Sequence, residues 1–194
     1  SSAQETLSDK MNLFYDNEIN IFVFGLGGGT GTGITQFILE HLNETNNQAG
    51  IKNKCNILFC TYPLNIETGG IQKANKALET IKHLVQLTIL VKLEDLRISG
   101  REDYPNVQRI FEATNLGINT IIQRMFDMDN NNFYQFVEDY SKDHNILEIK
   151  RFEDFQNYFS DGEKISQDKI SSINTHFTGQ GRDVEQLKIV TKYL

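Results

Sequence analysis

The residues with the clearest chemical potential form one glycine-rich run near the start of the chain. Six of the nine residues from Gly25 to Gly33 are glycine, and Thr30 and Thr32 stand between them. Glycine lets the backbone approach a ligand closely and can turn successive N–H groups to one side, where they bind an anion. One or two glycines would suffice for a tight turn alone. The run is therefore predicted to be a phosphate site, with the threonine hydroxyls as further donors.

The spacing within the run excludes two common nucleotide-binding loops. A P-loop needs a lysine directly after its last glycine, whereas Ile34 follows Gly33. The dinucleotide fingerprint needs glycine at its first, third and sixth positions. In the alignments that start at Gly25 and at Gly27, the sixth position is Thr30 and Thr32, respectively. The sequence GGGTGTG, residues 27–33, is therefore predicted to be a phosphate loop of another kind.

The elements that must position this run alternate between strands and helices. Uninterrupted apolar stretches predict strands at 19–24, 56–62 and 87–93, and helical spacing predicts helices after the first and second strands and a long helix at 106–126. Such alternation predicts an α/β fold with a parallel sheet covered by helices on both faces. Ligands of such sheets bind beyond the carboxyl ends of the strands, and the glycine run follows the first strand directly.

The composition restricts the class of protein. The 194 residues carry a net charge of −7, and Lys and Arg form no cluster typical of nucleic-acid binding. The longest apolar runs have strand length, so no membrane span is predicted, and we expect a cytoplasmic protein. Cys55 and Cys60 are expected to be buried thiols on opposite faces of a strand. No metal site is predicted, because metal-ligand spacing is lacking among His41, His83, His144 and His176.

The glycine run and its surroundings resemble the tubulin/FtsZ superfamily, especially its bacterial, phage and plasmid members. GLGGGTGTG, residues 25–33, is similar to the signature loop that surrounds the di- or triphosphate of GTP in this family. The resemblance covers residues 1 to about 140 and implies a partial GTPase-type domain with 106–126 as its long central helix. It implies GTP or GDP as ligand, together with Mg²⁺ held mainly by the phosphates and water.

The same resemblance assigns individual residues to the nucleotide. The residues expected on the phosphates are Gly27, Gly28, Gly29, Thr30, Gly31, Thr32 and Gly33. TYPLNIETGG, residues 61–70, is similar to the family segment whose glutamate reaches the ribose, and this places Glu67 there. Alignment of the central helix places Tyr104 and Gln108 at the base, where a flat ring and an amide supply stacking and hydrogen bonds. A surface tyrosine and an exposed helix glutamine are the alternative for this last pair.

The resemblance also divides the chain. Residues 1–126 are expected to form the partial GTP-binding domain, and residues 127–194 a catalytic-type loop followed by a small, truncated α+β segment of the second domain. The first three strands of the family have no counterpart in the sequence. We therefore expect a fragment or a degenerate form, in which the nucleotide pocket is incomplete.

Catalysis is the point at which the sequence departs most from the family. A loop after the family's central helix carries acids that position the attacking water in the next subunit's site. The family pattern that contains these acids aligns best with NNNFYQ, residues 130–135, where Asn132 and Gln135 replace the two acids. Amides orient water but cannot take its proton. A shifted register would use Asp127 or Asp129 instead, and a polar loop without a catalytic role remains the alternative.

Two functions follow from the resemblance. The first is a cytoskeletal GTP-binding protein that forms head-to-tail filaments in cell division or DNA segregation, with GTP hydrolysis impaired or retained. The second is a non-catalytic protein of the same fold that binds or caps filaments of related subunits. In both cases the expected partners are copies of the chain or similar subunits. Direct binding of nucleic acid is not expected.

Overall fold

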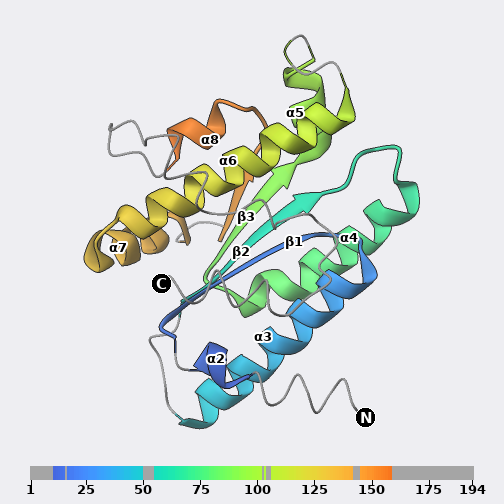
Figure 1. Cartoon of the computed structure of the whole chain (residues 1–194). Coiled ribbons are helices and arrows are strands. Elements are labelled where there is room, and N and C mark those ends of the chain that lie inside the picture. The colour runs from blue at the N-terminus through green and yellow to red at the C-terminus, as the bar shows by residue number, and fades with distance from the viewer. Residues whose placement is uncertain are drawn as a thin grey trace.

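Four parallel strands form one sheet in the computed structural model, in the order β1-β2-β3-β4 (Figure 1). The structure describes residues 11–15, 17–49, 55–101, 103, 106–141 and 145–158. The strands are β1 (Ile19–Gly25), β2 (Cys55–Tyr62), β3 (Leu87–Lys92) and β4 (Ile146–Ile149). The α/β architecture with a parallel sheet is confirmed, and the first three strands lie where the apolar runs predict them.

Helices connect the strands and cover the sheet. Before β2 the chain forms α2 (Asn12–Tyr15) and α3 (Gly29–Ala49), and between β2 and β3 it forms α4 (Thr68–Ile81) and the 3₁₀ helix η1 (Lys82–Leu84). The remaining helices are α5 (Leu93–Ser99), α6 (Val107–Asp127), α7 (Asn130–Ser141) and α8 (Asp154–Asn157). Helix α6 is the predicted long central helix, and its bounds differ from 106–126 by one residue at each end.

Both faces of the sheet are buried, as the uninterrupted apolar strands predict. Alternate strand residues, such as Phe22 and Leu58, pack against α2, α3 and α4 on one face. Their neighbours, such as Ile57 and Ile89, pack against α6, α7 and α8 on the other. Figure 1 shows these two helical layers on opposite sides of the strands. Because side chains alternate along a strand, each strand supplies both cores at once.

A pair of buried asparagines joins β1 to β2 at the amino end of the sheet. Asn20 and Asn56 are 0% and 2% exposed and lie directly opposite each other in the register. The Asn20 Nδ2 group donates to Asn56 Oδ1 at 3.1 Å and to the carbonyl oxygen of Phe14 in α2 at 3.2 Å. In an apolar core such a pair favours one strand register, because any slip would leave both amides unpaired.

Two segments differ in part from their predicted structure. The polar stretch EDLRISGREDYP, residues 94–105, is typical of a turn, but residues 94–99 lie in α5, which buries Leu93 and Leu96. In residues 127–145, where the sequence pattern predicts a polar turn and a short helix, α7 is that helix. Residues 130–135, aligned with the catalytic loop of the family, lie in its first turns, so only Met128 and Asp129 separate α6 from α7. Phe133 and Val137 are four residues apart and buried, and their burial against the sheet stabilises α7 over its polar composition.

Strand β4 comes from the part of the chain assigned to the second domain. It pairs with β3 in parallel, from Thr88 opposite Ile146 to Val91 opposite Ile149. The described residues after 127 therefore extend the sheet of the first part. The division of the chain at residue 126 stays a prediction. A further candidate strand of the sequence, LKIVTKYL (residues 187–194), lies outside the described residues.

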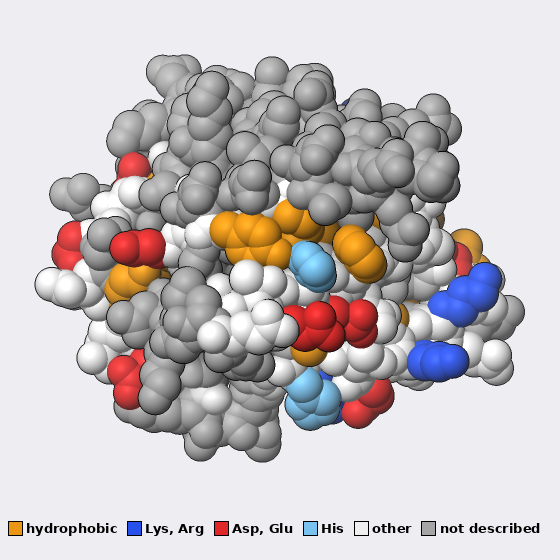
Figure 2. All heavy atoms as spheres, turned by 90° about the horizontal axis from the view of Figure 1, so that it is seen from below, with side chains coloured by type: hydrophobic (Ala, Val, Ile, Leu, Met, Phe, Trp, Pro, Cys, Tyr) orange, Lys and Arg blue, Asp and Glu red, His pale blue; other side chains and the backbone are white. Residues whose placement is uncertain are grey.

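Two stacked rings, of Phe37 and His41, lie on the outer surface of α3. The Phe37 side chain is 39% exposed, and its ring stacks on that of His41 with centroids 6.0 Å apart. Figure 2 shows hydrophobic and histidine side chains side by side on the lower side of the molecule, next to acidic groups. None of the helices in the described ranges is long and apolar enough to cross a membrane.

Candidate functional site

The glycine run lies at the carboxyl end of the sheet, between β1 and α3. The Leu26 amide donates to the Thr61 carbonyl oxygen at 2.9 Å, which continues the β1–β2 ladder into the turn. Gly27 then adopts a φ of +87°. A Cβ at Gly27 would lie 2.6 Å from the carbonyl oxygen of Gly70 in the first turn of α4. Gly27 is therefore required by the fold itself, because it allows two loops to touch through their backbones.

Two later glycines have no such structural reason. Apart from its chain neighbours and the helix backbone, a Cβ added at Gly29 or at Gly33 would meet no atom within 4 Å. Gly29 is the first residue of α3, and Gly33 lies in its second turn, where glycine costs about 0.5–1 kcal/mol relative to alanine. The fold accepts the cost at Gly33 without gaining a contact in return. Open space beside exposed backbone at the start of a helix is the arrangement that a bound phosphate requires.

The first turn of α3 supplies donors for an anion. The first N–H groups of a helix have no partner within the helix, and the helix dipole makes this end positive. No acidic residue lies in the first turn of α3 itself. The Thr30 side chain is exposed. The Thr32 hydroxyl oxygen is buried and has no hydrogen-bond partner among the described residues, a state that costs about 1–3 kcal/mol.

Glu67 lies beside the glycine run, at the end of the neighbouring strand. It precedes α4 directly, is exposed, and accepts a hydrogen bond from the Leu64 amide through Oε1 at 3.2 Å. A Cβ on Gly70 would lie 3.8 Å from the second carboxylate oxygen, Oε2. Because Gly70 also contacts Gly27, Glu67 lies at the same end of the sheet as the glycine run, with Gly70 between them. Oε1 holds the 64–67 turn through the Leu64 amide, and Oε2 lies beside Gly70. The ribose contact of Glu67 stays a prediction.

A second glutamate fixes the same loop from the end of β3. Glu94 Oε2 accepts a hydrogen bond from the Asn65 amide at 3.3 Å, while Oε1 pairs with the Arg97 guanidinium. The Arg97 hydrogen bond, followed by that of Asn65, lowers the pKa of Glu94. Glu94 therefore stays ionised at neutral pH and holds the 63–67 loop against α5. Glu94 is not among the residues predicted from the sequence.

The residues predicted at the base are only partly described. Gln108 lies in the first turn of α6, is exposed, and donates through Nε2 to Glu112 Oε1 at 3.1 Å. The helix begins here because the Asn106 side chain accepts the Arg109 amide at 2.9 Å. Since α6 starts beyond the carboxyl end of β3, Gln108 lies at the same end of the sheet as the glycine run. Tyr104 lies outside the described residues.

The two predicted catalytic amides lie on the exposed side of α7. The backbone amide of Asn132 donates to Asp129 Oδ1 at 3.0 Å, and Asp129 thereby caps the helix. Gln135 Nε2 donates to Asp139 Oδ1 at 2.9 Å, one turn further along. Both residues are therefore engaged with acids of the same segment. Neither residue lies near the glycine run of the same molecule.

Helix α7 lies at the opposite, amino end of the sheet. The Tyr134 hydroxyl donates to Glu18 Oε2 at 3.3 Å, and Glu18 directly precedes β1. Burial, with Glu18 as a second cause, raises the pKa of Tyr134. The glycine run follows the other end of β1. The structure thus separates the predicted phosphate loop and the predicted catalytic residues to the two ends of one sheet.

Gly70, which joins the two glycine-containing loops, is not among the residues predicted from the sequence. Its backbone contacts Gly27, and a side chain on it would face Glu67 and Pro63. The available signal was the pair Gly69–Gly70 directly after Thr68, since paired glycines at a helix start often mark a close backbone approach. Sequence spacing alone does not reveal which of two glycine-containing loops contacts the other.

Within the part of the chain that the structure describes, no group of three or more histidine, cysteine or acidic side chains could hold a metal ion. Cys55 and Cys60 are free, buried and on opposite faces of β2, as predicted. Comparisons of the chain with protein-family models, with curated proteins and with solved structures gave no match.

Proposed function

We propose that this chain is a GTP-binding protein of the tubulin/FtsZ kind that assembles head to tail. The observation that carries the proposal is the turn at 27–33, which follows a buried strand, starts a helix and keeps open space at Gly29 and Gly33. The resemblance of GLGGGTGTG to the family loop identifies the ligand class. In this proposal the turn binds the phosphates and Mg²⁺ accompanies the nucleotide through phosphate oxygens and water.

The remaining contacts follow from the positions along the carboxyl edge of the sheet. Glu67 Oε2 would accept a hydrogen bond from a ribose hydroxyl, while Oε1 keeps the loop folded through Leu64. Gln108 would exchange its bond with Glu112 for bonds to the base edge, and Tyr104 would stack on the base. These groups bind and orient the nucleotide. None of them performs the hydrolysis.

The positions of the glycine run and of α7 at opposite ends of the sheet support head-to-tail association, because stacked copies would bring these two ends together. The glycine run lies at the carboxyl end and α7 at the amino end. Stacking copies in one direction would place Asn132 and Gln135 of one subunit over the nucleotide of the next. Such heterologous contact forms open filaments.

A second candidate function is a non-catalytic partner of such filaments. The observation that favours it is the chemistry of Asn132 and Gln135, which are amides already bonded to Asp129 and Asp139. An amide orients water without accepting its proton, so nucleotide binding would persist without efficient turnover. GTP binding with neither phosphate release nor pelleting, together with suppression of assembly by a related filament protein, would favour this candidate.

The phosphate loop is tested by Gly29→Arg. The position faces open space, so the arginine should leave the fold intact while its side chain fills the volume that the phosphates need. We expect GTP affinity, measured by calorimetry, to fall at least about tenfold, which corresponds to about 1.4 kcal/mol. Circular dichroism should remain unchanged. Glu44→Ala, an exposed substitution later in α3, is the control and should bind GTP normally.

Two results would contradict the proposal. Unchanged GTP affinity in the folded Gly29→Arg variant would remove the phosphate site from this loop. A preference of the wild-type chain for ATP or a dinucleotide over GTP would remove the family assignment, even if the loop does bind phosphate.

A further inference from the structure

The outer edge of β4 presents unpaired backbone groups. The Thr88 amide of β3 donates to the carbonyl oxygen of Asn145 at 2.7 Å, and Thr88 lies opposite Ile146 in the register. In this parallel ladder the odd-numbered residues of the strand therefore direct their N–H and C=O groups toward β3. Ile146 and Glu148 direct theirs away from the sheet. Within the described ranges, no hydrogen bond reaches these two donors and two acceptors.

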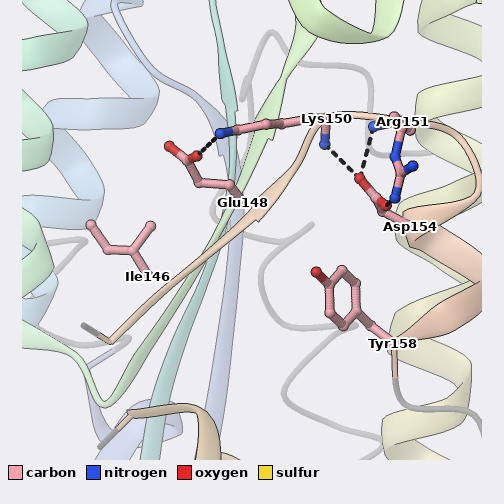
Figure 3. Close-up of a pocket in the computed structure, with 6 residues that line it drawn as sticks. All are labelled: Ile146, Glu148, Lys150, Arg151, Asp154 and Tyr158. Carbon is pink, nitrogen blue, oxygen red and sulfur yellow. Dashed lines mark hydrogen bonds and ion pairs between the residues drawn. The ribbon is translucent and has the colours of Figure 1, made fainter. Parts of the chain in front are cut away.

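A hollow lies in front of this edge. Its volume is about 590 Å³, within the range of roughly 300–1,000 Å³ that is usual for ligand pockets. Figure 3 shows Ile146 and Glu148 of β4 on one side of the hollow, and Asp154 and Tyr158 of the α8 segment on the other. The Lys150 amide, the next one that points outward, donates to Asp154 Oδ2 at 3.0 Å, so the open edge ends with the strand. The hollow therefore borders an edge of four residues and offers space to one short strand.

The acidic side chain on this edge is already paired within its own chain. Glu148 lies 3.4 Å from Lys92 Nζ and also pairs with Lys150. Because these ion pairs compensate its charge, the edge calls for no charged partner strand. Edge strands commonly avoid association through outward lysines, prolines or bulges, and the sequence ILEI of β4, paired without interruption to β3, has none of these. What the edge requires is a strand with matching backbone groups.

We propose that this edge pairs with β4 of a second copy of the chain, antiparallel, about a two-fold axis at Leu147. In this register Ile146 of each copy lies opposite Glu148 of the other. Residues opposed in this way exchange both N–H···O bonds, so the two donors and two acceptors of each edge are all used. Leu147 lies opposite its own counterpart on the apolar side, where it continues the core. The contact is self-complementary and therefore closes with two copies.

Other antiparallel registers fit the edge less well. An axis at Glu148 or at Ile149 would need the Lys150 amide, which is already hydrogen-bonded within its own chain. The axis at Glu148 would also place two acidic side chains directly opposite each other. An axis at Ile146 would place Glu148 beyond the first residue of the second strand. Pairing about Leu147 is therefore the register that uses the open groups of both edges and no others.

The pairing makes one continuous sheet in which the two copies run in opposite directions. Each copy contributes four strands, so the joined sheet has eight, and the two glycine runs face opposite ways. A contact of four residues from each copy is small beside the roughly 1,200–2,000 Å² that stable interfaces bury, so single chains should associate weakly. The inference does not rest on the proposed function. Where chains do assemble head to tail, repeated contacts of this kind would join two assemblies of opposite direction more tightly.

Cysteine cross-linking of the full chain tests the register. In Leu147→Cys the two thiols would face each other across the axis, with Cα atoms about 4.5 Å apart, which suits a disulfide. Ile149→Cys is the matched control, because both residues are buried on the same face of β4. Its thiols would lie about 14 Å apart along the strands, at about 3.4 Å for each of the four residue steps between them. With a mild oxidant, Leu147→Cys should give at least about tenfold more covalent dimer than Ile149→Cys.

Sedimentation of the full chain over a concentration series tests the backbone contacts. Glu148→Pro removes an outward amide at a position where an edge strand accepts proline. Glu148→Ala is its control, since it loses the same ion pairs with Lys92 and Lys150 but keeps the amide. The wild-type chain and Glu148→Ala should form dimers as the concentration rises. Glu148→Pro should associate at least about tenfold more weakly.

Three results would overturn the proposal. The first is a wild-type chain that stays monomeric at every concentration up to about 1 mM. The second is equal cross-linking of Leu147→Cys and Ile149→Cys. The third is equal dimerisation of Glu148→Pro and Glu148→Ala when circular dichroism shows that both are folded. If Glu148→Pro does not fold, the cross-linking pair decides alone. These measurements need no nucleotide, so GTP titration of the same proteins tests the proposed function separately.

Discussion

Gly33 lies in the second turn of α3, and a methyl group there would meet no atom within 4 Å. Gly33→Ala should therefore raise the free energy of unfolding by about 0.5–1 kcal/mol, because alanine restricts the unfolded chain and favours the helix. If phosphate needs this space, the same change should weaken GTP binding. Denaturant unfolding and calorimetry measure the two effects on one variant.

Gly27→Ala provides the contrast for this prediction. A Cβ there would lie 2.6 Å from the Gly70 carbonyl oxygen at a φ of +87°, so stability should fall rather than rise. Increased stability with unchanged GTP affinity in Gly33→Ala would mean that no ligand uses the open space.

The two cysteines are predicted to be chemically silent in the folded protein. Burial raises the pKa of Cys55 and of Cys60 to about 12, from 9.0. Since the thiolate is the reactive form, a disulfide reagent at about pH 8 should label neither residue until denaturant is added. Rapid labelling of either thiol in the native protein would contradict the burial of β2.

The same thiols make stability depend on alkaline pH. Above pH 9.0 the unfolded chain releases its thiol protons while the folded chain keeps them, so stability falls as pH rises toward about 12. Between these two pKa values each thiol lowers the free energy of unfolding by about 1.4 kcal/mol for every pH unit, and below pH 9.0 it does not change it. Cys60→Ala should reduce the slope of unfolding free energy against pH by about that amount, whatever its effect on absolute stability.

At the scale of elements, the sequence predicted the strands and the helix whose residues follow a clear hydrophobic pattern. Strands β1, β2 and β3 are largely apolar runs with a few polar residues such as Asn20, Asn56 and Thr88, and α6 repeats apolar residues at helical spacing over its whole length. Strand β4 is short and contains Glu148, so its membership of the sheet depends on pairing with β3, which sequence spacing does not encode. Helix α7 is polar on one side, and only the burial of Phe133 and Val137 distinguishes it from a loop.

The contact between α6 and α8 is the clearest case of a feature hidden from the sequence. A Cβ at Gly117 would lie 2.6 Å from Cδ1 of Phe155. Further along α6, Arg124 Nη1 donates to the carbonyl oxygens of Phe155, Gln156 and Tyr158 at 2.9, 3.0 and 3.0 Å. The sequence does not indicate a packing role for Gly117, whereas in the structure the Phe155 ring packs directly against its backbone.

Gly117→Ala should accordingly detach α8 from α6. We expect a loss of about 1–3 kcal/mol in unfolding free energy, as is usual when a methyl group is forced into a packed contact. Phe155→Leu costs stability by itself but should relieve part of the Gly117→Ala effect, so a double-mutant cycle should show coupling. Additive effects of the two changes would mean that the two side chains do not meet.

At the scale of the whole molecule, the separation of the glycine run from α7 makes hydrolysis, if it occurs, a property of the assembly. Under the proposed function, replacing both amides, Asn132→Asp with Gln135→Glu, should increase phosphate release only at concentrations at which filaments form, since the new acids would act on the next subunit's nucleotide. Phosphate release and pelleting, measured over a concentration series, test this. A rate increase independent of protein concentration would show that the residues act within their own subunit.

The same double variant has a structural control. The carboxylate that Gln135→Glu introduces would face Asp139 one turn away, and like charges at this spacing cost about 0.2–0.5 kcal/mol. Gln135→Lys should instead pair with Asp139 and stabilise α7 without supplying an acid. The lysine variant should therefore fold well and release no additional phosphate.

The asparagine pair between β1 and β2 affects the contact between the two glycine-containing loops at the other end of the sheet. Asn20 and Asn56 are at the amino end of the sheet, and the contact of Gly27 with Gly70 is beyond the carboxyl end. A slip of one residue between the strands would displace these loops by about 3.3 Å, the rise of a parallel strand. By fixing the register of β1 against β2, the pair thus sets the relative position of the two loops at the opposite end of the sheet. Substitutions at Asn20 or Asn56 should be judged by whether the two glycine-containing loops still meet.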